Sequence, residues 1–288
     1  MNKAYVDGAK GEIRQWESEG PGFMNHLTDF MFFPAGNLAR ALIPARIQRA
    51  VGKATYDLLS RLGSATELLI DQERIYQRVD AGYRKHGDEL RAADSAARRY
   101  RRKSIAYAAG EGSAAGALGF VGLAADIPAL LTISMRLIRQ IGTCYSYEMS
   151  SEEETEHALH VLRLGASSTM KAKVESLAGL KQVQRVLVRL SVTSATERLA
   201  TSLLGRLSVL AGLRQFAEKI GVQITARKAL ELVPVVGAVI GGSCNAMFVN
   251  DVGRAAYMAF RRRRIAELES PEAAALPSPA AYAMLFRR

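Results

Sequence analysis

Apolar and polar residues follow one another along this chain at the three-to-four residue spacing of amphipathic helices. Residues 1–20 carry Trp16 on their apolar face and end at Gly20-Pro21-Gly22. Residues 44–63 repeat the spacing, and Ser151, or Ser150 before it, stands ahead of a run of glutamates, a typical helix start. No segment shows the strict alternation of a strand. The pattern therefore predicts an all-α fold, a multi-helix bundle.

Two apolar, glycine-rich segments interrupt the amphipathic pattern. Residues 105–125 contain Gly112 and Gly116, and residues 232–249, which carry no charge, contain Gly237 and Gly241. Small residues four apart share one helix face and let a second helix approach closely. We expect both segments to pack in the centre of the bundle through these four glycines. The same faces could equally mediate a homodimer.

The pattern predicts three parts of the chain. Residues 1–104 read as amphipathic helices, and residues 105–268 as a helical core that forms one continuous domain with them. Residues 269–288 are rich in proline and alanine and are expected to be a flexible tail.

Charge is distributed unevenly. The chain carries a formal net charge of +11, which favours an anionic partner such as nucleic acid or the cytoplasmic leaflet of a membrane. Arg261, Arg262, Arg263 and Arg264 follow the second apolar segment, and we expect them to contact an anionic surface. Basic residues that complement the dipole at a helix C-terminus are the simpler alternative. No nucleic-acid-binding motif accompanies the charge, which disfavours that partner.

The apolar segments raise the question of membrane contact. Glu111, Asp126, Arg136 and Arg139 lie in or beside the first segment, and each would cost roughly 2.5–3.5 kcal/mol at the centre of a bilayer. We therefore rank a peripheral membrane-associated bundle first, a soluble bundle second and an integral protein third. The N-terminus reads as no signal peptide. The expected location is the cytoplasm, at the inner face of the membrane.

Five residues are candidates for a ligand-binding or structural site: Glu111, Asp126, Pro128, Arg136 and Asn245. An acid in an apolar helical region is costly unless it is paired or hydrated. Asp126 stands just before Ile127-Pro128, so we favour a helix N-cap at a break there. A buried Asn245 would most simply hydrogen-bond a neighbouring helix.

Metal and cofactor chemistry finds little support. Glu154, His157 and His160 have a helical spacing that occurs in metal sites, but no second copy completes the ligand set. We interpret them as part of a glutamate-rich surface helix, and expect no metal and no cofactor. A glycine loop at 110–113 lacks the lysine of a phosphate-binding loop.

Two motifs resemble those of the EcsC family of bacterial helical proteins. The first is GFVGLAADIPALLTISMRLI at 119–138, followed by Ile141 and Tyr145; the second is VPVVGAVIGGSCNAMF at 233–248, followed by the arginines at 261–264. They occur in the family's order, and the resemblance extends over about residues 10–268. It implies a helical fold, and it carries over no catalytic residue.

We expect a non-enzymatic, membrane-associated accessory protein that contacts anionic lipid or a membrane protein partner. The alternative is a soluble helical enzyme, or a ligand-binding protein, that acts on an apolar or lipid-like small molecule. In that case Glu111, Asp126 or His157 would line a pocket between helices.

Overall fold

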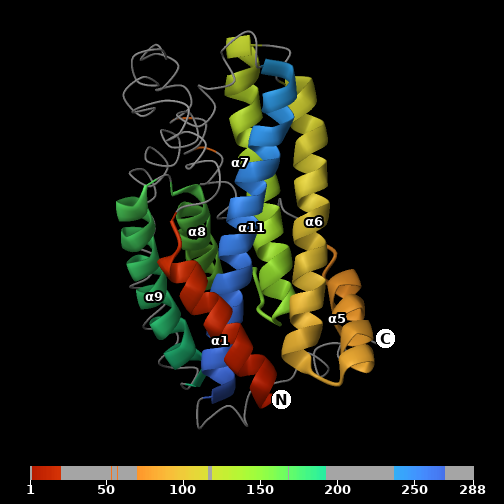
Figure 1. Ribbon diagram of the computed structural model, residues 1–288, viewed down its shortest axis with the longest axis vertical. Helices are drawn as coiled ribbons and strands as arrows, with labels where there is room; N and C mark the ends of the chain where they lie inside the picture. Colours follow the sequence, from red (N-terminus) through yellow and green to blue (C-terminus); the bar gives the residue numbers. More distant parts are fainter. Residues whose placement is uncertain are drawn as a thin grey trace.

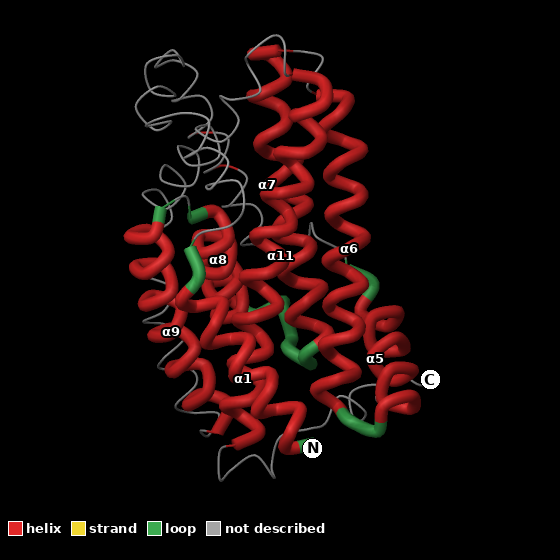
Figure 2. Tube along the Cα trace, viewed as in Figure 1, coloured by secondary structure: helices red, strands yellow, loops and turns green. Residues whose placement is uncertain are grey.

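The computed structural model describes residues 2–20, 53, 57, 70–115, 119–167, 169–192 and 237–269. For 112–115, 119–126, 152, 186, 188–192 and 237–243 it describes the backbone alone. This part of the chain contains helices and no strand, so the all-α prediction is confirmed (Figure 2). The helices are α1 Lys3–Ser18, α5 Gln72–His86, α6 Glu89–Ala115, α7 Gly119–Cys144, α8 Glu152–Ala166, α9 Met170–Val192 and α11 Gly237–Glu269.

Helix α11 is the axis of the bundle. It packs against α6, α7, α8, α9 and α1, while α5 packs on α6 and α7. Figure 1 shows α6, α7 and α11 side by side, with one end of each reaching beyond α1, α5, α8 and α9. That end comprises the last turns of α6 and the first turns of α7 and α11. The other helices surround the opposite half of this three-helix core.

Several helix ends follow the local sequence. The Asn2, Asp71 and Ser151 side chains accept hydrogen bonds from the backbone N–H groups of Tyr5, Arg74 and Glu154, and so cap α1, α5 and α8. The expected helix at the N-terminus and the expected start at Ser151 are both confirmed. Helix α5 ends at Gly87, whose φ of 63° is a left-handed conformation that glycine adopts without strain.

The break expected at Asp126–Pro128 is wrong. Helix α7 is continuous from Gly119 to Cys144 and contains Pro128 in its interior, so Asp126 is not the N-cap of a helix that begins there. Ile127, Leu130 and Leu131, the apolar side chains next to Pro128 that the structure describes, are fully buried. Their packing outweighs the one backbone hydrogen bond that proline removes.

A second boundary also differs from the expectation. The sequence suggested amphipathic helices up to residue 104 and a separate apolar segment from 105, but α6 runs unbroken from Glu89 to Ala115. The basic run at 98–103 lies within this helix. Arginine and lysine are good helix formers, so a run of them does not end a helix.

Close helix contacts involve glycines that the sequence analysis did not select. A Cβ on Gly165 would lie 2.5 Å from the Val252 Cα, and one on Gly253 would lie 2.9 Å from both Arg101 Cγ and Leu137 Cδ2. Of the four glycines expected at contacts, Gly112, Gly237 and Gly241 lie in helices whose side-chain surroundings there are outside the described residues, and Gly116 is itself outside them. Their role stays a prediction.

Candidate functional site

The four consecutive arginines of α11 lie near carboxylates of three other helices, α1, α6 and α8. Successive residues on an α-helix are rotated by about 100°, so four in a row surround the helix. Arg261 pairs with Asp94 of α6 and Glu12 of α1, Arg262 with Glu17 of α1, Arg263 with Glu154 of α8, and Arg264 lies 3.6 Å from Glu89 of α6. Such an arrangement requires a helix that has neighbours on all sides.

Arg261 belongs to a cluster around the buried carboxylate of Asp94. Its Nη2 lies 2.9 Å from Asp94 Oδ2, and the hydroxyls of Tyr5 and Tyr145 donate to the two oxygens at 2.5 and 2.6 Å. Burial alone would lower the pKa of Arg261, but the charge of Asp94 raises it. Burial and the same carboxylate raise the pKa of Tyr145. The cluster therefore holds an ion pair with neutral tyrosines.

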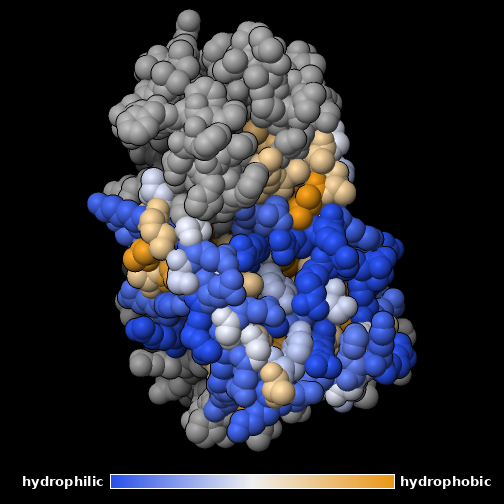
Figure 3. Space-filling view, in the orientation of Figure 1, coloured by the Kyte–Doolittle hydropathy of each residue, from blue (hydrophilic) through white to orange (hydrophobic). Residues whose placement is uncertain are grey.

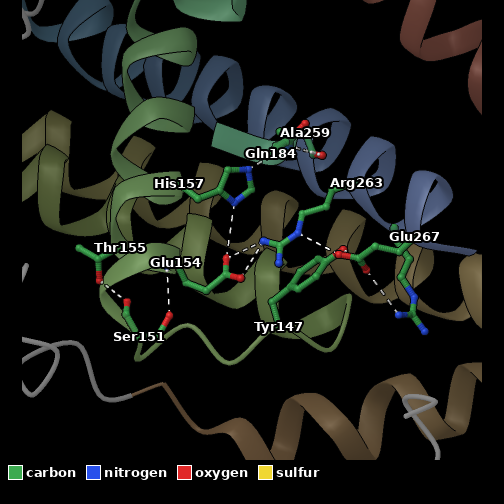
Figure 4. Close-up of polar contacts among 10 residues, drawn as sticks. Tyr147, Ser151, Glu154, Thr155, His157, Gln184, Ala259, Arg263 and Glu267 are labelled. Carbon is green, nitrogen blue, oxygen red and sulfur yellow. Dashed lines mark hydrogen bonds and ion pairs between the residues drawn. The ribbon is translucent and has the colours of Figure 1, made fainter. Parts of the chain in front are cut away.

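Arg263 belongs to a second buried cluster, which Figure 4 shows between α8 and α11. Its Nη1 donates to both oxygens of Glu154, at 2.7 and 2.9 Å, and its Nε donates to Glu267 at 3.0 Å. The guanidinium carbon lies 3.9 Å from the ring centroid of Tyr147, whose hydroxyl donates to Glu267 at 2.9 Å. Every charge in this cluster has an opposite partner, as a buried ion requires.

His157 extends the second cluster towards α9. The Gln184 amide nitrogen lies 2.9 Å from both His157 Nε2 and the Ala259 carbonyl oxygen, so it donates to each. The ring proton of a neutral His157 is therefore on Nδ1, which lies 3.6 Å from Glu154 Oε2 (Figure 4). Burial lowers the pKa of His157. Burial would raise the pKa of Glu154, but its interactions with His157 and Arg263 lower it.

These contacts correct the expectation that Arg261, Arg262, Arg263 and Arg264 form a surface for anionic lipid. Three of the four are buried, and Arg262 is bound by Gln184 and Glu17. A buried guanidinium needs a carboxylate partner, and apart from Glu267 on α11 itself the carboxylates come from residues 109 to 249 positions away. The alternative of a simple helix C-terminus does not describe them either, because they lie between helices.

The expectation of a glutamate-rich surface helix is also wrong for two of its residues. Glu154 and His157 face the interior, and His157 is completely buried. Among the described residues, no group of three or more histidines, cysteines, aspartates or glutamates could hold a metal ion. Sequence reasoning missed Asp94 as well. The signal was present, since Asp94 lies among Ala92, Ala93, Ala96 and Ala97, on a helix face that is otherwise apolar.

The structure describes the side chains of four of the five predicted site residues, and these differ in burial. Glu111 and Arg136 are exposed, Pro128 is half-buried, and Asn245 is buried within α11. The side chain of Asp126 lies outside the described residues. Glu111 accepts a hydrogen bond from the exposed Tyr107 hydroxyl at 2.8 Å, which raises the pKa of Tyr107. The charge of Arg136 opposes this rise in the pKa of the same tyrosine. Four of the predicted site residues lie in the halves of α6, α7 and α11 that lead to the protruding end of the three-helix core, and the exception is Arg136, in the other half of α7.

A small cavity of about 100 Å³ lies between the ends of α1 and α8, α9 and α11. Lys173 lines it and donates to the carbonyl oxygens of Trp16 and Glu19, at 2.6 and 2.7 Å. Arg254 lines it and pairs with Glu19 at 2.8 Å. Cavities that bind drug-sized ligands measure about 300–1,000 Å³. This one is too small for such a ligand, and its two basic side chains are already engaged.

A sharp boundary of charge crosses α6, α7 and α11 at one level. Arg101 donates to Asn250 at 2.8 Å, and Gly253 touches Arg101 and Leu137, so these residues mark the same height. Towards the protruding end, residues 104–115, 119–135 and 237–250 carry two charges, those of Glu111 and Asp126. Just at the boundary, exposed basic side chains form a band, which we name the basic band: Arg99, Arg102, Lys103 and Arg136.

The surface reflects the boundary. In Figure 3, hydrophilic side chains cover the lower part of the visible face, and hydrophobic ones gather higher up, over the long helices. Tyr107, one turn beyond Lys103, is 58% exposed. None of the described helices combines the length and the hydropathy needed to cross a membrane.

Comparison with known proteins agrees with the resemblance seen in the motifs. The chain is 24% identical over 268 residues to the Bacillus subtilis (strain 168) protein YdbA, itself described as uncharacterized; the match covers 89% of this chain and 91% of YdbA. No solved structure matches the chain significantly. A sequence model of the EcsC protein family matches residues 8–265. This match includes the capped start of α8, both glycine-rich segments and the arginines of α11, and the chain therefore belongs to the EcsC protein family.

Proposed function

We propose that this protein is a non-enzymatic accessory protein that binds peripherally to an anionic membrane surface, at the cytoplasmic face. The contact is made by the protruding ends of α6, α7 and α11, with the basic band at the level of the lipid head groups. The observation that carries the proposal is the boundary of charge across these three helices. It separates an apolar end from an ion-paired body.

The dimensions of the apolar end favour a peripheral contact. Residues 237–250 of α11 precede Asp251 without a charge, and at about 1.5 Å per residue they extend for ~20 Å. The hydrocarbon core of a bilayer is about 30 Å thick. The end is long enough to reach into one leaflet. Glu111 is exposed close to this end, which favours a position near the head groups for that side of α6.

The basic band supplies the electrostatic part of the interaction. Its four side chains are exposed and lie on α6 and α7, and each basic residue near an anionic surface contributes about 1 kcal/mol. Exposed Tyr107 lies next to the band. Tyrosine is enriched where membrane and water meet, because its ring is apolar and its hydroxyl is polar. The band takes the role that the sequence analysis assigned to Arg261–Arg264.

Flotation with liposomes tests the proposal. The purified protein is mixed with vesicles of neutral or anionic lipid, at low and high salt. We expect flotation with anionic vesicles, weakened by salt, because screening reduces attraction between surface charges. The double variant Arg102→Glu, Lys103→Glu should bind at least about tenfold more weakly. The matched control is Arg84→Glu, Lys85→Glu, an adjacent exposed pair at the last turn of α5.

Two results would contradict the proposal. No flotation with any vesicle would assign the apolar ends to contacts between protein segments, and a dimer seen by size-exclusion chromatography would then identify a homodimer interface. Equal loss of binding in the α6 variant and in the α5 control would show that binding depends on net charge alone. The basic band would then have no specific part in it.

A further inference from the structure

Helix α1 is attached to the bundle by a buried apolar face and by ion pairs along its C-terminal half. Glu12 pairs with Arg261 at 2.5 Å, Glu17 with Arg262 at 2.5 Å and with Lys181 at 2.7 Å, and Glu19 with Arg254 at 2.8 Å. All the basic partners belong to α9 and α11. The three carboxylates are partly exposed, with side-chain exposures of 58%, 20% and 33%.

The apolar part of this attachment is one face of α1 that joins the hydrophobic core. Val6, Ala9, Ile13 and Trp16 are the buried residues of α1. The C-terminal end of α1 is held by Lys173, which donates to two of its carbonyl oxygens and lies 5.1 Å from the centroid of the Trp16 ring. A helix of this length is marginally stable by itself in water, so its order depends on this docking.

We propose that α1 is a displaceable cover over a basic face, and that an anionic membrane surface displaces it. The basic face consists of Lys173, Lys181, Arg254, Arg261 and Arg262. This inference rests on the proposed membrane contact and adds a regulated second contact to it. Lipid phosphates offer the same acceptor chemistry as the α1 carboxylates, and arginine binds phosphate with paired hydrogen bonds.

The position of the basic face supports this role. Arg254 lies one turn beyond Asn250, where Arg101 marks the boundary of charge. The Arg254 end of the face thus lies near the level of the basic band, and Arg261 and Arg262 lie about two turns further along α11. An anionic membrane bound to the basic band lies close to Arg254 and to the acidic C-terminal end of α1. Its negative charge attracts Arg254 and repels the acidic end of α1.

Both arginines at the centre of the basic face keep a hydrogen-bond partner when the face is uncovered. Arg261 keeps Asp94, and Arg262 keeps Gln184. Lys181 and Arg254 have side-chain exposures of 38% and 39% even with α1 in place. Lys173, half-enclosed by α1 itself, becomes hydrated when α1 leaves. The remaining bundle keeps both buried clusters, apart from the Tyr5 hydroxyl at Asp94.

Trp16 is the only tryptophan of the chain and lies on the buried face of α1. Its fluorescence therefore reports whether the helix is docked. The full-length protein is titrated with neutral or anionic vesicles, and quenching of Trp16 by acrylamide is measured together with amide hydrogen exchange of residues 3–18. Anionic vesicles should raise quenching severalfold and speed up exchange. Neutral vesicles should do neither. In the absence of lipid, high salt should raise quenching, because it screens the partly exposed ion pairs.

A pair of variants separates the cover from general charge effects. Glu17→Gln removes one α1 carboxylate with two basic partners, and Asp7→Asn removes an exposed carboxylate of α1 for which the structure describes no ion pair. Glu17→Gln should lower the anionic lipid concentration that gives half-maximal quenching by about two- to fivefold, the factor for losing partly exposed pairs. Asp7→Asn should leave it unchanged. Circular dichroism checks that both variants are folded.

The outcomes distinguish this inference from the proposed function. Saturating flotation with anionic vesicles, while Trp16 quenching and the exchange of residues 3–18 stay constant, would overturn the displaceable cover and leave membrane binding intact. Absence of flotation would overturn both. Equal shifts for Glu17→Gln and Asp7→Asn would also overturn the cover, since the effect would then follow net charge.

Discussion

The Arg263 guanidinium of α11 and the Glu154 carboxylate of α8 meet through two hydrogen bonds of 2.7 and 2.9 Å, although they are 109 residues apart in the sequence. Both side chains are buried, and Glu267 accepts a further hydrogen bond from Arg263. The pair constrains the rotation of α11 relative to α8, because the guanidinium must face Glu154 to make both of these hydrogen bonds. It is therefore a determinant of how the helices are arranged.

Removing one partner of this pair should destabilise the protein strongly. In Arg263→Met the apolar stem is retained, while Glu154 is left as a buried carboxylate without its cation. We expect the free energy of unfolding to fall by about 3–5 kcal/mol, measured by urea denaturation followed by circular dichroism. Arg99→Met, at an exposed position of α6, is the control and should change it by less than about 0.5 kcal/mol. Similar losses in both variants would show that the buried pair of Arg263 contributes no more to the free energy of unfolding than an exposed arginine does.

The extent to which the sequence anticipated this arrangement depends on the range of the interactions. Ser151 and Asn2 act within one helical turn, and the apolar face around Trp16 repeats at helical spacing, so local pattern was sufficient for α1 and α8. The partners of Arg261 and Arg263 are far away in the chain. Four adjacent arginines look the same in a solvated helix and in one surrounded by acids, and only the neighbouring helices distinguish the two.

Pro128 shows a different limit. Its preference for the first turn of a helix is local and small, whereas the burial of the apolar residues on both sides of it involves the whole bundle. The glycines show the same limit. Gly165 is essential to a close contact because Val252 happens to cross it, and no spacing rule within α8 predicts that crossing.

The stability should decrease in mild acid. Burial lowers the pKa of His157 and lowers that of His160 from 6.5 to about 4. The unfolded chain therefore binds more protons than the folded protein below pH 6.5, and stability is complete above that pH and is lost as the pH falls towards 4. One such histidine contributes a slope of about 1.4 kcal/mol per pH unit. The lowered pKa of Glu154 also makes stability fall with decreasing pH, at lower pH values than the histidines do. Its carboxylate is paired in the folded protein, and acid protonates it more readily in the unfolded chain.

Urea denaturation at several pH values between 7 and 4 measures this dependence. His160→Gln should reduce the slope, because it removes one titrating group and keeps a polar side chain of similar size. His86→Gln, an exposed position at the end of α5, is the matched control and should leave the slope unchanged. A His160→Gln variant with the slope of the wild type would contradict the assignment.

A methyl group at Gly165 should disrupt the contact between α8 and α11. The Cβ of Gly165→Ala would lie 2.5 Å from the backbone Cα of Val252, so a helix must shift. We expect a loss of about 1–3 kcal/mol in the free energy of unfolding, typical of overpacking. Gly8→Ala is the counterpart, since a Cβ there meets nothing within 4 Å and the position lies in α1. It should stabilise the protein by about 0.5–1 kcal/mol. Destabilisation by both variants would rule out the close approach as the cause.

Lys173 should control the order of the C-terminal end of α1. Its ammonium group donates to the carbonyl oxygens of Trp16 and Glu19, groups that a helix end leaves without partners inside the helix. In Lys173→Met these acceptors lose a charged donor, and we expect a loss of about 1.5–3 kcal/mol. The loss should be local, so that acrylamide quenching of Trp16 rises while the far-ultraviolet circular dichroism of the bundle changes little. Lys171→Met, exposed and two residues away, should do neither. If Trp16 stays shielded in Lys173→Met, the apolar face of α1 alone is sufficient to hold the helix, and Lys173 is not its anchor.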